Sequence, residues 1–171
     1  MPKKDLRNAT LTIRDATTPT PLSTVVKIGT GNITFTENYP MEYETDRGSI
    51  ANGTVRRGDD VPVEVNVTCT WFEILSEATD LPLVYTPKEL LRGEGRAVAA
   101  ISVGADPCEP YACELELLLE VECATGARKD EKIVFDEFRV ESCAFDVSAG
   151  TLVFSGKSKQ ISPSVTRPAQ A

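Results

Sequence analysis

Four glutamates at alternating positions have the clearest potential for chemistry in this chain. They are Glu114, Glu116, Glu120 and Glu122 in the segment CELELLLEVEC. Residues two apart in a strand share a face and lie about 7 Å apart, which overlaps the separation of paired glycosidase carboxylates. Catalytic pairs normally come from different elements that meet in a cleft, however. We therefore interpret these acids as a solvated strand face.

The remaining residues offer little to an enzyme or a metal site. The chain has no histidine, which removes the commonest general base and the commonest metal ligand. Asp59-Asp60 lacks the alternating oxygen ligands of a calcium loop. Gly93-Glu94-Gly95 is too short for a phosphate-binding loop and has no helix after it. We predict a protein that is not an enzyme and that uses no metal or other cofactor.

The five cysteines do not form a metal-binding or redox motif. Cys69, Cys123 and Cys143 lie in apolar stretches, where cysteine usually behaves as a small core residue. Cys108 and Cys113 flank the short loop DPCEPYAC. This pair is predicted to form a local disulfide in an oxidising medium and to stay reduced in a cytosol.

Length and composition indicate a globular protein. The 171 residues are 41% hydrophobic and 26% charged, which fits one domain with or without flexible arms. No apolar run approaches the ~20 residues of a membrane helix, and the start MPKKDLRNAT does not look like a secretory signal. The net charge of −8 argues against a protein that grips phosphates. It fits simple solubility, or a surface past which a polyanion slides.

Alternating apolar and polar residues predict that strands dominate the fold. In the segment VPVEVNVTCTW, every second residue from Val61 to Trp71 is apolar, and these residues share one face of the predicted strand. The residues between them form the opposite, polar face. Shorter strands are predicted at Ala9–Arg14, Thr24–Ile28, Asn32–Thr36, Met41–Thr45, Val98–Val103, Lys132–Val140 and Leu152–Gly156. Seven or more such strands predict a mainly β fold, an antiparallel sandwich or barrel.

One short helix is expected beside the strands. Thr86-Pro87-Lys88-Glu89 combines an N-cap, a proline at the first helical position and a capping-box glutamate. Leu90 and Leu91 supply an apolar edge, and Gly93 ends the helix. A second helical turn is predicted within Trp71–Ala78.

The segment DRGSIANGTVRRGDD, residues 46–60, is predicted to be a long hairpin loop that turns at Asn52-Gly53. It holds three arginines and three aspartates, so its formal charge is zero. A loop of this length is either mobile or a contact arm for a neighbouring subunit. The tail from Lys157 to Ala171, which is cationic and carries two prolines, is predicted to be an arm or disordered.

These features resemble the tail tube proteins of long-tailed, non-contractile bacteriophages. The resemblance covers about residues 24–158 and rests on an Asp46-Arg47-Gly48 turn, a Gly58-Asp59-Asp60 step and the alternating strand that ends in tryptophan. The helix TPKELLRG and the closing strand GTLVFSGKS are also similar to that family.

The resemblance implies a β-sandwich flanked by a helix, in which six subunits pair their sheets into a ring. Rings stack through a long hairpin into a hollow tube, and DNA passes through the lumen during ejection without sequence-specific binding. Residues 24–158 would be the tube domain, 1–23 an N-terminal arm with the first strand, and 159–171 a C-terminal arm. The protein would be made in the host cytoplasm, reside in the virion tail and contact tail-terminator and baseplate proteins.

Two groups of site residues follow from this resemblance. The predicted inter-ring contact residues are Asp46, Arg47, Arg56, Arg57, Asp59 and Asp60. The predicted lumen-facing residues are Asn32, Thr34, Thr36, Glu42, Glu44, Glu64, Asn66, Thr68 and Thr70.

Other functions remain open at this point. A tail-terminator, baseplate or secretion-system tube protein would share the sandwich and the ring. A monomeric β-sandwich binding module, for instance for carbohydrate, would require exposed aromatic residues, and the chain has one Trp and four Tyr. A hydrolase is the weakest alternative.

Overall fold

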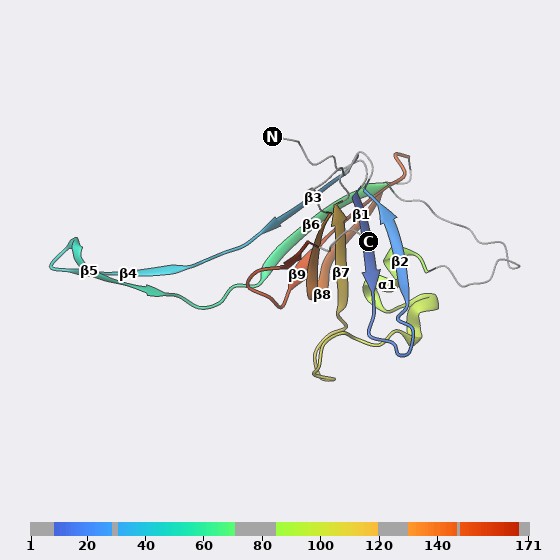
Figure 1. Cartoon of the computed structure of the whole chain (residues 1–171), viewed down its shortest axis with the longest axis horizontal. Coiled ribbons are helices and arrows are strands. Elements are labelled where there is room, and N and C mark those ends of the chain that lie inside the picture. Colours follow the sequence, from blue (N-terminus) through green and yellow to red (C-terminus); the bar gives the residue numbers. More distant parts are fainter. Residues whose placement is uncertain (1–8, 29–30, 71–84, 120–129, 147, 168–171) are drawn as a thin grey trace, which may run out of the picture.

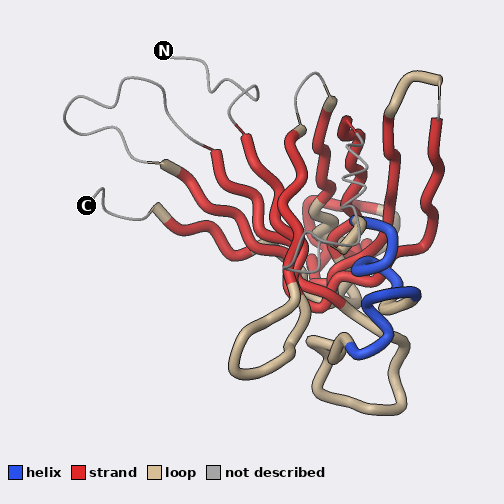
Figure 2. The backbone as a smooth tube through the Cα atoms, turned by 90° about the vertical axis from the view of Figure 1, so that its right-hand side faces the viewer, coloured by secondary structure: helices blue, strands red, loops and turns tan. Residues whose placement is uncertain are grey.

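The computed structural model describes residues 9–28, 31–70, 85–119, 130–146 and 148–167. Within them the chain is mainly β, with one short α-helix and one 3-10 helix (Figure 1). The strands are β1 (Ala9–Arg14), β2 (Ser23–Lys27), β3 (Asn32–Thr36), β4 (Met41–Asp46), β5 (Ser49–Arg57), β6 (Val63–Thr70), β7 (Cys113–Leu119), β8 (Glu131–Asp146), β9 (Thr151–Ser158) and β10 (Ser164–Thr166). The helices are α1 (Pro87–Arg92) and the 3-10 helix η2 (Gly95–Ala99), which lie to one side of the strands in Figure 2.

The large sheet has the antiparallel strand order β2-β1-β7-β8-β9-β6-β3, and β10 pairs with the first half of β8. The long strand β8 belongs to two layers, because its first half pairs with β7 and its second half with β9. One hydrophobic core, with residues from β1, β2, β6, β7, β8, β9 and α1, lies between these layers. The predicted antiparallel sandwich with a flanking helix is confirmed.

A bulge in β8 lets one strand serve both layers. Phe135 and Phe138 are both fully buried, although residues three apart in a regular strand point to opposite faces. Glu137 between them has a positive φ of 46°, and the register with β7 shifts at this point. On the other side, a Cβ on Gly156 would lie 2.1 Å from the Arg139 carbonyl oxygen. Glycine therefore allows β9 to approach the bent strand.

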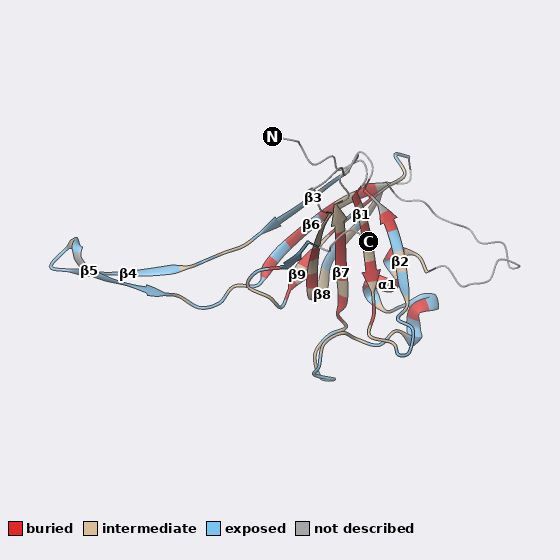
Figure 3. Cartoon of the chain, viewed as in Figure 1, coloured by how far each residue is buried: buried red, intermediate tan, exposed pale blue. Residues whose placement is uncertain are grey.

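The predicted apolar strand faces form much of the core (Figure 3). In β6, Val63, Val65, Val67 and Cys69 are at most 1% exposed and alternate with polar residues. Between the layers, the ring of Phe35 on β3 packs edge-on against Phe135, with ring centroids 5.4 Å apart.

The predicted helix forms where its signals place it. The Glu89 amide donates to the Thr86 hydroxyl (3.3 Å), and the Glu89 carboxylate accepts from the Thr86 amide (3.1 Å). Gly93 ends α1 in the left-handed conformation, and Leu90 and Leu91 are buried. No helix in the described ranges is long and apolar enough to cross a membrane.

The strand predicted at Val98–Val103 is wrong. Its start belongs to η2, in which Ala97 is buried and Val98 is 76% exposed. The following segment is held by Asp15, whose carboxylate accepts from the Ile101 amide (3.0 Å), rather than by a strand ladder. The helical turn predicted within Trp71–Ala78 lies outside the described residues.

The strand predicted at Ala9–Arg14 in the N-terminal segment forms as β1, and the C-terminal tail, predicted as an arm or disordered, also contains a strand. β1 lies within the large sheet, between β2 and β7, and β10 in the tail pairs with β8. The division of the chain at residues 23 and 158 remains a prediction.

Candidate functional site: a projecting hairpin and a polar sheet face

Residues 41–57 form a two-stranded ribbon that projects from the sandwich (Figure 1). The chain turns at Arg47-Gly48, where both residues have positive φ. The predicted loop with a turn at Asn52-Gly53 is therefore wrong, because these two residues lie inside β5. A Cβ on Gly53 would lie 1.9 Å from the Glu44 carbonyl oxygen, and the register shifts beside it. The glycine serves a close approach of the strands rather than the turn.

The ribbon has one apolar side and one charged side. On one side Met41 pairs with Arg57 and Tyr43 with Val55, and we call this the apolar side because it is apolar except for Arg57 at its base. On the charged side Glu42 pairs with Arg56 and Glu44 with Thr54. Met41, Tyr43 and Val55 are 50%, 63% and 57% exposed, and the ribbon is exposed along most of its length (Figure 3). The apolar side therefore lacks a cover from the described part of its own chain.

Three charged residues of the ribbon have ion-pair partners, one pair within it and one at its base. Arg56 Nη2 lies 3.2 Å from Glu44 Oε2, and the Thr54 hydroxyl donates to the same carboxylate at 3.0 Å. At the base, Arg57 Nη2 lies 2.8 Å from Asp60 Oδ1. Exposed pairs of this kind contribute about 0–1 kcal/mol each.

The six predicted contact residues all lie on the ribbon or at its base, and all are exposed. Asp46 and Arg47 lie at the tip, Arg56 in β5, and Arg57, Asp59 and Asp60 at the base. Their role in a contact between rings remains a prediction. The exposed apolar side was missed at the sequence level, although the alternation of Met41, Tyr43 and Val55 with charged residues is its signal.

Seven of the nine predicted lumen residues lie on the paired strands β3 and β6. The register joins Asn32 to Thr68, Thr34 to Asn66 and Thr36 to Glu64, and Thr70 pairs with Thr151 on β9. Glu42 and Glu44 lie apart from them, on the charged side of the ribbon. That these residues face a lumen remains a prediction.

The polar surface of β3 and β6 continues onto β9 and β8, and we call this surface the polar face. Ser155 pairs in register with Asn66 and with Ser142, and the two serine hydroxyls are 2.7 Å apart. Lys157 Nζ lies 3.5 Å from Glu141 and 4.0 Å from Glu64. The polar face thus carries mainly hydroxyl and amide groups, and its charges lie close to opposite charges.

The glutamates of β7 are not a solvated face throughout. Glu116 is only 9% exposed, and its Oε2 lies 2.9 Å from Arg14 Nη1 and 2.7 Å from Lys132 Nζ. The solvated interpretation is wrong for Glu116 because β7 is a central strand, so cations from β1 and β8 reach its polar face. Glu120 and Glu122 lie outside the described residues.

The described cysteines are free thiols, so the local disulfide between Cys108 and Cys113 is not present. Cys113 is buried in the core at the start of β7, whereas Cys108 is exposed on the preceding loop. Burial raises the pKa of the Cys113 thiol to about 12 and that of Cys69 to about 11. These two thiols therefore stay protonated and act as core residues. Cys123 lies outside the described residues.

A metal site is equally unsupported by the described residues. No group of three or more Cys, Asp or Glu side chains among them is arranged to hold a metal ion.

Comparisons of the sequence do not assign the chain to a protein family, whereas a comparison of structures finds proteins with a similar fold. No protein-family model matches it, and no curated protein sequence does so. The fold is similar to a chain of the sheath–tube complex of the PVC extracellular contractile injection system in its extended state, with 8% identity, a TM-score of 0.50 and coverage of 97% of this chain and 93% of the other. A chain of the sheath/tube terminator of the same system aligns with 7% identity, a TM-score of 0.47 and 92% coverage of both chains.

Proposed function

We propose that the chain is a structural subunit of a hollow tail-type tube, built from rings of identical copies that stack through the ribbon β4–β5. The observation that carries this proposal is the ribbon itself. It projects from a folded sandwich, its Arg56 pairs with Glu44 within the ribbon, and its apolar side is exposed. An isolated two-stranded hairpin is only marginally stable in water, so such an arm gains stability when it lies against another molecule.

The comparison supports a repeating assembly as the setting for this arm. The similar chain comes from a complex that contains a tube, and the alignment covers nearly all of both chains. The sequence resembles tube proteins of non-contractile phages, and the fold is similar to a chain from a contractile injection system. Both likenesses point to the same sandwich fold. We therefore propose a tube subunit in general, and a phage tail as its setting.

In this proposal six copies form each ring and the polar face lines the lumen. Its hydroxyl and amide groups, with charges that lie near opposite charges, offer a moving polyanion no concentrated cationic surface, so counterion release cannot hold DNA on the wall. Terminator and baseplate proteins would contact the two ends of the tube.

Electron microscopy of the purified protein tests the proposal. We expect rings or hollow tubes by negative stain, with a shared diameter for both forms. The same protein with residues 41–57 replaced by a short Gly-Ser turn should remain folded by circular dichroism and should no longer form long tubes. A protein that stays monomeric at all concentrations and salt conditions would contradict the tube function.

A further inference from the structure

Two connections that interrupt the strand ladders join the ribbon to the sandwich. The first connection is residues 37–40, between β3 and β4, and the second is residues 58–62, between β5 and β6. Each contains a proline, Pro40 or Pro62, which has no amide hydrogen to donate to a ladder. The Gly58 amide donates to the Pro40 carbonyl oxygen (2.9 Å), but the pairing of β3 with β6 does not run on into that of β4 with β5. Continuous strand pairing therefore does not fix the direction of the ribbon.

The length of the ribbon makes its direction sensitive to how its base is held (Figure 1). The strand β4 has six residues, which at about 3.3 Å per residue gives a length of about 20 Å. A swing of about 15° at the base would therefore move the tip by about 5 Å, which is the spacing between neighbouring strands. A tip that must meet a fixed surface needs a base held more tightly than this.

The chain between β9 and β10, residues 159–163, lies at the base of the ribbon, and we call it the strap. Its start is fixed to the bend in β8. The hydroxyl of Ser158, the buried last residue of β9, donates to the Asp136 carbonyl oxygen (2.5 Å). The Gln160 side chain accepts from the Asp136 amide through Oε1 (3.1 Å). Because Asp136 follows the fully buried Phe135, the strap begins from a part of the sandwich that is packed into the core.

The strap contacts both connections of the ribbon. The Gln160 carbonyl oxygen accepts from the Val63 amide (2.9 Å), where the second connection enters β6. In the first connection, the Tyr39 hydroxyl donates to the Glu37 carboxylate and accepts from the Ser162 side chain. The hydrogen bond to Glu37 raises the pKa of Tyr39, and the one from Ser162 partly offsets this shift. One short segment therefore links the bend in β8 to both sides of the ribbon base.

We propose that the strap, residues 159–163, sets the direction in which the ribbon β4–β5 projects. Contacts on two different connections resist rotation of the ribbon relative to the sandwich, which a contact on one connection alone would allow. A ribbon with a preset direction also has less freedom to lose when it docks. This inference rests on the proposed function, in which the ribbon reaches a neighbouring ring, and it names the part of the chain that aims the ribbon.

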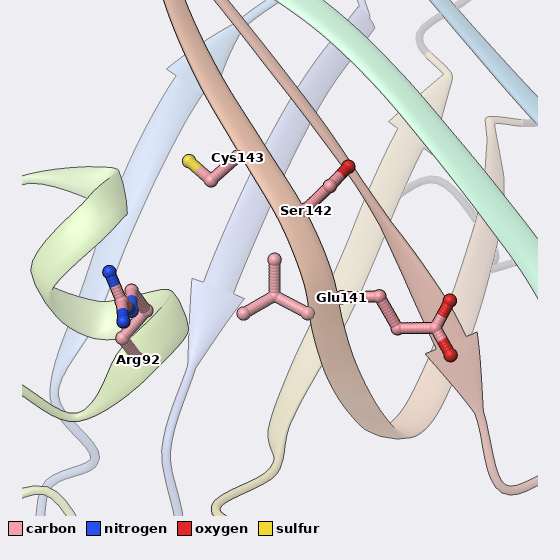
Figure 4. Close-up of a pocket in the computed structure, with 5 residues that line it drawn as sticks. Arg92, Glu141, Ser142 and Cys143 are labelled. Atoms are coloured by element: carbon pink, nitrogen blue, oxygen red, sulfur yellow. The ribbon is translucent and has the colours of Figure 1, made fainter.

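Distances between two spin labels, measured by double electron–electron resonance, test the strap. One label is attached at Thr45→Cys in the ribbon and the other at Glu141→Cys in β8. Glu141 is exposed, and in Figure 4 its side chain points away from the hollow of about 220 Å³ beside the end of α1. The measurement is made below the critical concentration for tube growth, so that no neighbouring copy holds the ribbon.

The native thiols must not compete for the labels. Cys69 and Cys113 are buried and are kept. The other three cysteines are replaced by Cys108→Ser, Cys123→Ser and Cys143→Ala. Circular dichroism of this background, before and after labelling, checks that the sandwich remains folded.

A pair of deletions separates the strap from β10. In the full-length chain we expect a narrow distribution of label distances. Deletion of residues 160–171 removes the strap contacts together with β10, and the distribution should become broad. The matched deletion of residues 164–171 removes β10 and keeps Gln160 and Ser162, so the distribution should stay narrow.

A full-length variant makes the same test without truncation. Gln160→Ala combined with Ser162→Ala removes the side-chain contacts of the strap with β8 and with Tyr39, and should broaden the distribution. The control Glu37→Ala removes the other partner of Tyr39 and should leave the distribution narrow. In the native cysteine background, the double variant should raise the critical concentration for tube growth by about 2- to 10-fold, because a swinging ribbon must be ordered when it docks.

Each contrary result overturns the strap. A folded double variant with a narrow distribution does so, and this variant decides alone if the chain without residues 160–171 does not fold. Broadening by deletion of residues 164–171 that equals the broadening by the longer deletion would show that β10 holds the ribbon instead. The distances require no tubes, so they still test the strap if the unmodified protein forms none, a result that would refute only the proposed function.

Discussion

The two sides of the ribbon β4–β5 allow a sharp test of what holds stacked rings together. We would replace Met41, Tyr43 and Val55 on the apolar side with threonine, which has a high preference for strands. The ribbon should therefore still form, while the surface that it presents to a neighbour loses its apolar character. We expect the sandwich to stay folded and tube growth to fail.

The size of the effect follows from how much of each side chain remains to be covered. Full burial of a large apolar side chain contributes about 1.5–3 kcal/mol. The three side chains are 50%, 63% and 57% exposed, so covering the remainder contributes about 2.5–5 kcal/mol per arm by the same rule. Because ordering the arm offsets part of this gain, we expect the critical concentration for tube growth to rise at least about tenfold, which corresponds to 1.4 kcal/mol.

The assay is sedimentation of tubes over a range of protein concentrations, with circular dichroism to confirm the fold. The matched control replaces Glu42, Glu44 and Arg56 on the charged side with threonine. Arg56 already pairs with Glu44 inside the ribbon at 3.2 Å, so this control should change the critical concentration only about twofold, within the ~0–1 kcal/mol of exposed pairs. If the control abolishes growth and the apolar variant grows normally, the ribbon docks through its charges and our reasoning fails.

Three further predictions concern the sandwich. Gly156→Ala should destabilise the fold by about 1–3 kcal/mol in urea unfolding, since its Cβ would lie 2.1 Å from the Arg139 carbonyl oxygen; unchanged stability would show that the bulge in β8 relaxes freely. Glu116→Gln should cost about 1–3 kcal/mol because the carboxylate lies within 3 Å of two cations, whereas Glu114→Gln, whose pair is 4.0 Å long, should cost less. A maleimide at pH 8 should label Cys108 in the folded protein and should label Cys69 and Cys113 only after unfolding. Burial raises the pKa of Cys69 to about 11 and that of Cys113 to about 12, so both buried thiols stay protonated. Labelling of Cys69 and Cys113 in the folded protein would contradict their burial.

Local patterns predicted the elements that depend on local physics. The alternation in Val63–Thr70 and the capping box at Thr86 both appear in the structure as expected. The bend of β8 was not predicted, because a positive φ at Glu137 leaves no mark in the pattern of side chains. The Asn52-Gly53 signal misled because glycine serves close strand approach as well as turns.

The candidate site was harder to predict because it depends on pairing between strands. Arg56 and Arg57 were predicted to contact a neighbouring ring, but Arg56 lies 3.2 Å from Glu44 on the other strand of the ribbon, and Arg57 lies 2.8 Å from Asp60. A formal charge of zero for the segment was equally compatible with internal pairs. β8 and β9 contribute to the polar face because they continue the sheet from β6 in the order β6-β9-β8. The order of strands in a sheet could not be predicted from this sequence.

The separation of Glu42 and Glu44 from the polar face changes the expected character of the lumen. With both on the ribbon, Glu64 is the single glutamate of the predicted lumen set that stays on the sheet, and Lys157 lies 4.0 Å from it. If the polar face lines the lumen, the wall is closer to neutral than a ring of three glutamates per copy would make it. A neutral wall neither adsorbs nor strongly repels a polyanion, so the passage of DNA should depend only weakly on salt. A steep salt dependence of passage through reconstituted tubes would show that a charged surface other than the polar face lines the channel.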